Sequence, residues 1–110
     1  MKSSATVPTA HAARYMVQLC KHFGHRTPAT WDGQEGRISF EAGEAALRAT
    51  PDTLLLVSSS ADPEGLARVE RVVASHLKRF AFREPDLAVE WRRGPSVSPT
   101  PLSPRASPPA

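Results

Sequence analysis

The sequence predicts an α+β fold, in which an antiparallel sheet of four to five strands carries two helices on one face. Two segments repeat apolar residues with a helical period, and the short segments between them alternate apolar and polar residues, as half-buried strands do. The connections between these short segments are too brief for parallel crossovers. The expected order is strand, helix, three or four strands, helix, strand. At 110 residues the chain is long enough for one domain with a modest core.

The first helix is expected over residues 10–23, after a short strand at residues 4–7. Thr9 is the expected N-cap and Gly24 the expected end. At 100° per residue, the apolar positions share a narrow arc with Tyr15 and Cys20 on its borders. The arc contains Ala12, Met16, Leu19 and Phe23. This helix is therefore amphipathic, with one face suited to covering a sheet.

Four strands are expected next, at residues 29–31, 37–40, 45–49 and 53–58. The turns between them are expected at Asp32-Gly33, at residues 41–43 and at residues 50–52. A second helix follows, with Asp62 as N-cap and Pro63 in the first turn, and runs to Phe80. Its apolar stripe contains Leu66, Val69, Val73, His76, Leu77 and Phe80. A last strand is expected from the alternation of Leu87, Val89 and Trp91.

The composition divides the chain into a domain at residues 1–93 and a Pro/Ser-rich tail at residues 94–110. Six of the 11 prolines lie in the tail, and its few apolar residues are scattered. Such a segment buries too little surface to offset its ordering entropy, so we expect it to be disordered.

Charge and hydropathy exclude several partners. The net charge is +3, and only +2 without the tail, which is too small to indicate a nucleic-acid binder. The longest strictly apolar run is residues 54–57, too short for a membrane span. One cysteine forms no internal disulfide, and no export signal follows Lys2. We therefore expect a cytoplasmic protein without nucleic-acid or membrane partners.

The histidines are the most suggestive residues for chemistry. His22 and His25 are the local candidates for a metal ion, iron or zinc, but a site needs a third ligand such as a carboxylate from elsewhere. Cys20 points about 160° away from His22 on the helix, and His11 lies about 16 Å further along it. The simpler interpretation is a solvated polar helix face, so no cofactor is predicted.

Two further groups are candidate ligand-binding residues. His11, Arg14 and Tyr15 stand in the first turns of the helix, where an anion is favoured. Arg79 and Arg83 are four apart and would clamp an acidic ligand if the second helix continued, or would pair with Glu84 or Glu90.

His76 is either a satisfied core histidine or a ligand-contacting residue at the rim between helix and sheet. It is the core-facing imidazole that would activate Cys20, although a buried structural thiol is the simpler interpretation of that residue.

The sequence also resembles a family. The segment His76-Leu77-x-Arg79-Phe80-Ala81-Phe82-Arg83-Glu84, followed by Trp91, and the His-rich first helix resemble small bacterial proteins grouped as a domain of unknown function, DUF2218, over about residues 5–92. The resemblance implies a small soluble intracellular protein and an association with iron or siderophore functions, without an established activity. Its recurring positions fall on His11, Arg14, Tyr15, Cys20, His22, His25, His76, Arg79, Phe80, Phe82, Arg83 and Trp91.

Three functions remain open. The first is a non-catalytic binding or accessory protein, whose His/Arg site takes a small acidic ligand or a metal chelate. The second is an interaction module that forms homodimers through the second sheet face, where Leu55 and Val57 are expected. The third is a small enzyme that uses His11 or His76 as acid or base. The absence of familiar catalytic motifs favours the first two.

Overall fold

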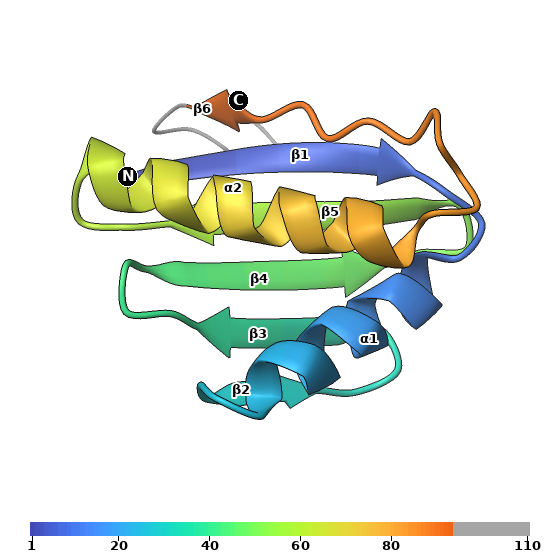
Figure 1. The fold of residues 1–110 in the computed structure, drawn as a ribbon, viewed down its shortest axis with the longest axis horizontal. Helices are drawn as coiled ribbons and strands as arrows, with labels where there is room; N and C mark the ends of the chain where they lie inside the picture. The colour runs from blue at the N-terminus through green and yellow to red at the C-terminus, as the bar shows by residue number, and fades with distance from the viewer. Residues whose placement is uncertain (94–110) are drawn as a thin grey trace, which may run out of the picture.

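The computed structural model describes residues 1–93 and has the expected two-layer architecture. Six strands form one antiparallel sheet in the order β2-β3-β4-β5-β1-β6, and both helices lie on the same face of it (Figure 1). The strands are β1 (Lys2–Pro8), β2 (Ala29–Trp31), β3 (Glu35–Ser39), β4 (Glu44–Ala49), β5 (Thr53–Ser59) and β6 (Arg92–Arg93). The helices are α1 (Ala12–Gly24) and α2 (Pro63–Phe80). The sheet has six strands, one more than the four to five expected, because all four segments between the helices join it, including the short edge strand β2. The Pro/Ser-rich tail lies outside the described residues.

The three hairpin turns form where the sequence predicts them. In the turn from β2 to β3, the Asp32 carboxylate accepts hydrogen bonds from the backbone N–H groups of Gln34 and Glu35, both at 2.8 Å. The β3–β4 turn is closed by reciprocal backbone bonds between Phe40 and Gly43. These tight connections fix the register of the meander. As a result, the buried residues of β4 and β5 alternate toward the helices as expected.

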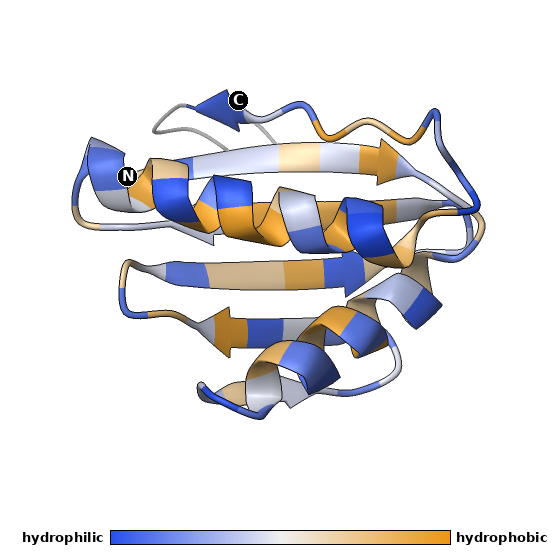
Figure 2. Cartoon of the chain, in the orientation of Figure 1, coloured by the Kyte–Doolittle hydropathy of each residue, from blue (hydrophilic) through white to orange (hydrophobic). Residues whose placement is uncertain are grey.

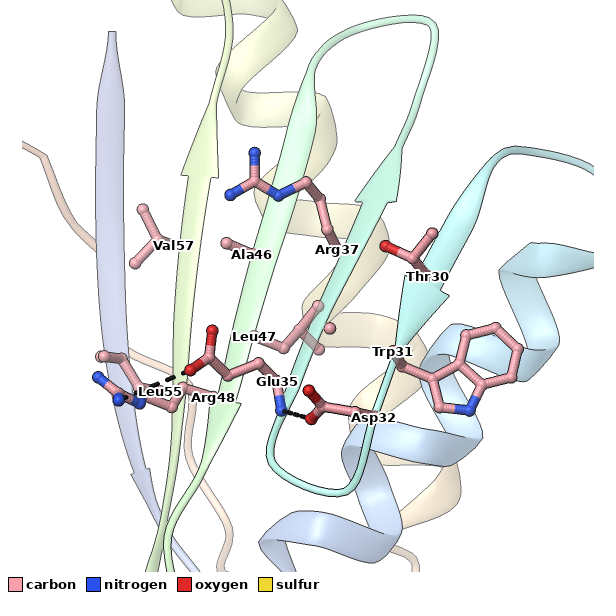
Figure 3. Close-up of a pocket in the computed structure, with 11 residues that line it drawn as sticks. Thr30, Trp31, Asp32, Glu35, Arg37, Ala46, Leu47, Arg48, Leu55 and Val57 are labelled. Carbon is pink, nitrogen blue, oxygen red and sulfur yellow. Dashed lines mark hydrogen bonds and ion pairs between the residues drawn. The ribbon is translucent and has the colours of Figure 1, made fainter.

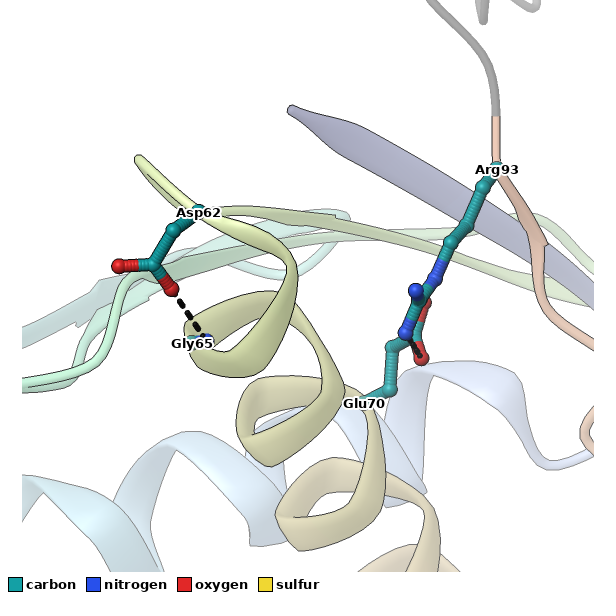
Figure 4. A network of polar contacts seen from close by, with 4 residues as sticks. All are labelled: Asp62, Gly65, Glu70 and Arg93. Atoms are coloured by element: carbon teal, nitrogen blue, oxygen red, sulfur yellow. Dashed lines mark hydrogen bonds and ion pairs between the residues drawn. The ribbon is translucent and has the colours of Figure 1, made fainter.

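The helices cover the sheet with one apolar face each, and bands of hydrophilic and hydrophobic residues alternate along them (Figure 2). Helix α1 packs over strands β2 to β5, and α2 packs over β4 and β5. Helix α2 begins as predicted, because the Asp62 carboxylate accepts a 2.7 Å hydrogen bond from Gly65 N (Figure 4). The shared core contains Val7, Met16, Leu19, Ile38, Leu54, Leu56, Val69, Val73 and Leu77.

The start of α1 differs from the prediction. The helix begins at Ala12, two residues late, and its N-cap is His11 without a side-chain cap. Thr9 was expected to cap the helix, but its hydroxyl accepts a 3.1 Å hydrogen bond from His11 N and so closes the preceding turn. A threonine before a helix satisfies such N–H groups in either arrangement, and for this reason the sequence pattern does not distinguish them.

The last strand also differs. Leu87, Val89 and Trp91 do alternate and are partly buried against the core, but only β6, at Arg92–Arg93, pairs with β1. Alternation reports which side chains are buried, and it does not require a hydrogen-bonded ladder. Arg93 fastens this strand to α2 through two hydrogen bonds to the Glu70 carboxylate, at 2.9 and 3.1 Å (Figure 4).

Gly36 in β3 allows the closest approach of the sheet to α1. A Cβ atom added there would lie 2.6 Å from the Sγ atom of Cys20. Cys20 is fully buried, so the thiol has little room to move. The missing side chain of Gly36 in β3 therefore leaves the space that the Cys20 side chain of α1 occupies.

We expect Gly36→Ala to lower the free energy of unfolding by about 1–3 kcal/mol, because the added methyl overfills the core. Cys20→Ala removes the opposing sulfur, so the double variant should lose at least about 0.5 kcal/mol less than the sum of the two single losses. Urea unfolding of the four proteins measures this coupling.

Gly33→Ala is the matched control, since nothing lies within 4 Å of a Cβ atom at that turn position. Its free energy of unfolding should change little, and strict additivity of the Gly36 and Cys20 changes would contradict the contact.

Candidate ligand-binding site

A cleft of about 400 Å³ opens between the first turns of α1 and the segment that follows α2. Helix α1 supplies one wall, and the end of α2 with the turn after it supplies the other. The lining residues are His11, Arg14, Tyr15, Gln18, Phe80, Phe82, Arg83 and Glu84. The site thus joins residues about 70 positions apart in the sequence, and four of the predicted ligand-binding residues meet in it.

The Glu84 carboxylate holds the two walls together. The Thr9 hydroxyl donates to both of its oxygens, at 3.1 and 2.9 Å, and the Tyr15 hydroxyl donates to Oε2. Thr9 and Tyr15 are both buried, which limits exchange of these bonds with water. The turn after α2 is therefore anchored to the start of α1 by a charge-assisted network.

This network sets the protonation of both partners. Burial raises the pKa of Tyr15 to about 12, and the hydrogen bond to Glu84 and its negative charge act in the same direction. Donation from Tyr15 lowers the pKa of Glu84 below its ordinary value, with help from Thr9 and against the effect of burial. At neutral pH the carboxylate is ionised and the phenol is protonated, so Tyr15 is a donor in this cleft and not a base.

Two guanidinium groups in the cleft have no carboxylate partner among residues 1–93. Arg14 is exposed on α1, and Arg83 lies with its Cζ 5.6 Å from the centre of the Phe82 ring. The predicted alternative, a pairing of Arg83 with Glu84, does not form, because Thr9 and Tyr15 take that carboxylate. The cleft therefore has two cationic groups for one carboxylate that is already hydrogen-bonded.

Arg79 does not join this site. Helix α2 ends at Phe80, with Ala81 as C-cap, so Arg83 is not aligned with Arg79 along a helix face. The predicted clamp by these two arginines required the helix to continue for another turn. In the described part of the chain, neither Glu84 nor Glu90 forms an ion pair with either arginine.

His22 and His76 form a separate cluster where α1 crosses α2. Their ring centres are 4.9 Å apart, and each ring also contacts Phe23. His22 is exposed, as the sequence predicts, and its ring also contacts Phe80, with 5.7 Å between centres. These contacts remove water from part of the imidazole and, with the nearby charges of His76 and Arg79, lower the pKa of His22 below its usual value.

His76 is half-buried at the rim of the helix layer and not in the core. Its Nδ1 lies 2.8 Å from the carbonyl oxygen of Val72, one helical turn earlier, so a backbone partner satisfies the polar ring. His76 is therefore not a core histidine: its neighbours are the rings of His22 and Phe23 on α1, and a contact with a ligand stays a prediction.

His22 and His25, the predicted metal ligands, do not form a three-ligand site within residues 1–93. His25 is the C-cap of α1, and it borders a different hollow with Lys21 and Trp31. The imidazole that His22 touches belongs to His76. Within residues 1–93, no group of three or more His, Cys, Asp or Glu side chains is arranged to hold a metal ion.

Cys20 is a core residue. Burial raises the pKa of its thiol to about 11, so it is protonated at neutral pH. A cysteine nucleophile requires the opposite, a thiolate stabilised by a neighbouring cation or imidazole. The interpretation as a structural thiol agrees with its contact with Gly36.

Within residues 1–93 no helix covers the second face of the sheet, which carries a hollow of about 480 Å³ (Figure 3). Leu55 and Val57 lie on this face, as expected from the alternation of β5. Its charged residues pair with each other, Arg37 with Glu44 at 3.4 Å and Arg48 with Glu35 at 3.6 Å.

Three residues of the site were not predicted as ligand-binding residues. Thr9, expected as an N-cap, and Glu84, expected as a partner of the arginines, build the network, and Gln18 lines the wall. Glu84 stands in the most distinctive segment of the chain, but its partners are 69 and 75 residues away. No local spacing connects such positions, so only the strand and helix packing reveals the site.

Neither α1 nor α2, the helices within residues 1–93, combines the length and apolar character needed to cross a membrane.

We expect Tyr15→Phe to lower the free energy of unfolding at pH 7 by about 1–3 kcal/mol, because it removes a hydrogen bond to a charged group. Since the pKa of Glu84 is depressed in the folded state, its contribution is complete above the ordinary value of 4.5 and disappears as pH falls through the folded value. The deficit of Tyr15→Phe should therefore shrink as the pH falls below 4.5 and through the lowered folded-state pKa of Glu84.

Urea unfolding followed by circular dichroism at several pH values measures this effect. Glu84→Gln should show the same flattening of the pH profile, whereas Glu90→Gln, an exposed carboxylate, should keep the wild-type profile. A deficit of Tyr15→Phe that is equal at every pH would contradict the network.

Comparisons with known proteins agree with this architecture. The family model described as "Uncharacterized protein conserved in bacteria (DUF2218)" matches residues 4–92. The NMR structure of PA4090 from Pseudomonas aeruginosa is similar, with a TM-score of 0.71 and 38% identity, over 83% of this chain and 94% of that one. No protein with a curated description matches the chain. The chain therefore belongs to the DUF2218 family of uncharacterized proteins conserved in bacteria.

Proposed function

We propose that the protein is a non-catalytic binding protein that holds a small organic anion in the cleft between α1 and the segment after α2. The observation that carries this proposal is the pair of guanidinium groups, Arg14 and Arg83, which line one cleft from distant parts of the chain. Neither has an ion-pair partner in the described part of the chain. Arginine is well suited to carboxylate and phosphate, because its planar fork donates two parallel hydrogen bonds.

The surroundings of the two arginines support an anion further. Helix α1 has no acidic residue in its first turn and no side-chain cap, so its free N–H groups face this end of the molecule. The carboxylate that lines the cleft, that of Glu84, forms no ion pair with either arginine, and two guanidinium groups beside one carboxylate leave the cleft with a net positive charge. The size of the cleft, about 400 Å³, suits a small molecule better than a polymer.

Binding without catalysis is the simpler proposal for this site. The acid–base alternative needs His11 or His76 beside a reacting group. His11 lines the cleft, but His76 lies in the other cluster, against Phe23 and His22. Tyr15 and Glu84 are fixed in one protonation state at neutral pH. Besides the groups that hold charge, the cleft has one imidazole, that of the exposed His11.

If the protein acts with iron or siderophores, the same cleft would bind the iron chelate. A ferric chelate is an organic anion, and its free carboxylates are suitable partners for Arg14 and Arg83. The protein would then contact the chelate and not the iron, because no described group of three or more ligating side chains is arranged for a metal ion.

The test is an NMR titration of ¹⁵N-labelled protein with acetate, with inorganic phosphate and with gallium citrate. Gallium citrate is the diamagnetic analogue of ferric citrate. We expect shifts confined to residues 11–18 and 80–84, and a loss of affinity of about tenfold or more in Arg14→Ala and Arg83→Ala, since each removes a hydrogen bond to a charged group.

The matched control is Arg68→Ala, which removes an equal charge from the exposed face of α2. It should change the affinity by no more than about twofold, because exposed charges at a distance are screened. Equal losses in all three variants would indicate attraction to net charge alone and would overturn the proposed site.

A homodimer through the uncovered sheet face is the second candidate. The hollow lined by Leu55 and Val57 favours it, because apolar residues on an unpaired face mark interaction surfaces (Figure 3). Sedimentation equilibrium of wild type and Leu55→Asp tests this. A dimer that dissociates in the variant supports it, and a monomer at about 100 μM, where an interface of standard size would be populated, rules it out.

A further inference from the structure

We infer that the anion bound in this cleft is aromatic, with its ring against Phe82 and its charged group on Arg14 and Arg83. This inference rests on the proposed function and narrows its ligand class. Its basis is the position of Phe82, an exposed apolar ring in a cationic cleft. The binding of an anion does not by itself explain why an apolar ring is exposed there.

Phe82 is 72% exposed, the largest exposed fraction of any large apolar side chain among residues 1–93. The other three phenylalanines of the chain, Phe23, Phe40 and Phe80, are partly buried against the core. An exposed aromatic ring normally needs no explanation when it stands alone. Phe82 instead shares one cleft with Phe80 and two guanidinium groups, an arrangement typical of a site with an apolar wall and a few polar anchors.

The turn that carries Phe82 is held on both sides. Ala81 N donates to Leu77 O at 2.9 Å, and Glu84 N donates to Ala81 O at 2.8 Å. The Glu84 side chain is fixed by Thr9 and Tyr15. The backbone around the exposed ring is thus preorganised, so a ligand pays little entropy to order it.

The ring and the cation are already assembled. Arg83 Cζ lies 5.6 Å from the centre of the Phe82 ring, within the range of a cation–π contact. An aromatic anion would place its ring beside Phe82 and its charge beside the same guanidinium. An aliphatic anion would reach Arg14 and Arg83 equally well but would lack the offset or edge-to-face contact that aromatic pairs gain beyond shared burial.

The experiment compares benzoate, cyclohexanecarboxylate and acetate, which carry the same charge, by NMR titration of the full chain. We expect benzoate to bind about five- to tenfold more tightly than acetate, the size of effect that an aromatic contact provides. Cyclohexanecarboxylate should lie between them. Phe82→Ala should bring benzoate to the affinity of acetate and leave acetate within about twofold of wild type.

Two further variants test whether the preference for benzoate depends on the aromatic ring of Phe82. One keeps an apolar side chain at this position, and the other removes an aromatic ring elsewhere. Phe82→Leu keeps an apolar side chain and should lose most of the preference for benzoate over cyclohexanecarboxylate. Trp31→Ala removes the other exposed aromatic ring, at the far edge of the sheet, and should leave benzoate binding unchanged.

The outcomes distinguish the two proposals. If acetate and benzoate bind the cleft with equal affinity in wild type and Phe82→Ala, the aromatic class is wrong and the anion site stands. If none of the carboxylates shifts residues 11–18 or 80–84, both proposals fall, and the exposed Phe82 then belongs to a protein contact.

Discussion

The architecture of the site depends on one carboxylate. Glu84 receives the hydroxyls of Thr9 and Tyr15, and in doing so it ties the turn after α2 to the junction between β1 and α1. Without this link, the segment after α2 would be held mainly by the partial burial of Leu87, Val89 and Trp91 and by the ion pair of Arg93 with Glu70. The cleft exists because these two stretches of chain are kept at a fixed distance from each other.

The same carboxylate decides which charges are available. A glutamate beside Arg83 in the sequence would ordinarily neutralise it. Here both oxygens of Glu84 accept hydrogen bonds from buried hydroxyl groups, and the neighbouring guanidinium lies beside the ring of Phe82 instead. A polar network that is satisfied internally thus leaves the guanidinium groups beside it without an ion-pair partner among residues 1–93.

Local patterns predicted most of the fold. Asp62 and Pro63 mark the start of α2, and Asp32-Gly33 marks a hairpin, because each residue type meets a backbone requirement within three positions. The strand predicted from the alternation at residues 87–91 was wrong, because partly buried side chains in an irregular segment alternate as they do in a strand. The site was predicted in pieces: His11, Arg14, Tyr15 and Arg83 were candidates, but their meeting point depends on Glu84. Contacts across 69 to 75 residues arise from tertiary packing, which no spacing encodes.

Phe80 has a position that links the two clusters. It forms part of the wall of the cleft, and on its other side it contacts the imidazole of His22. Contact with these rings and with neighbouring positive charges makes that imidazole harder to protonate. A ligand that displaced Phe80 on entering the cleft would also change the environment of His22, and binding of that ligand and protonation of His22 would then be linked equilibria. By reciprocity, a molecule that bound more weakly when His22 was protonated would itself hinder protonation of His22 when bound.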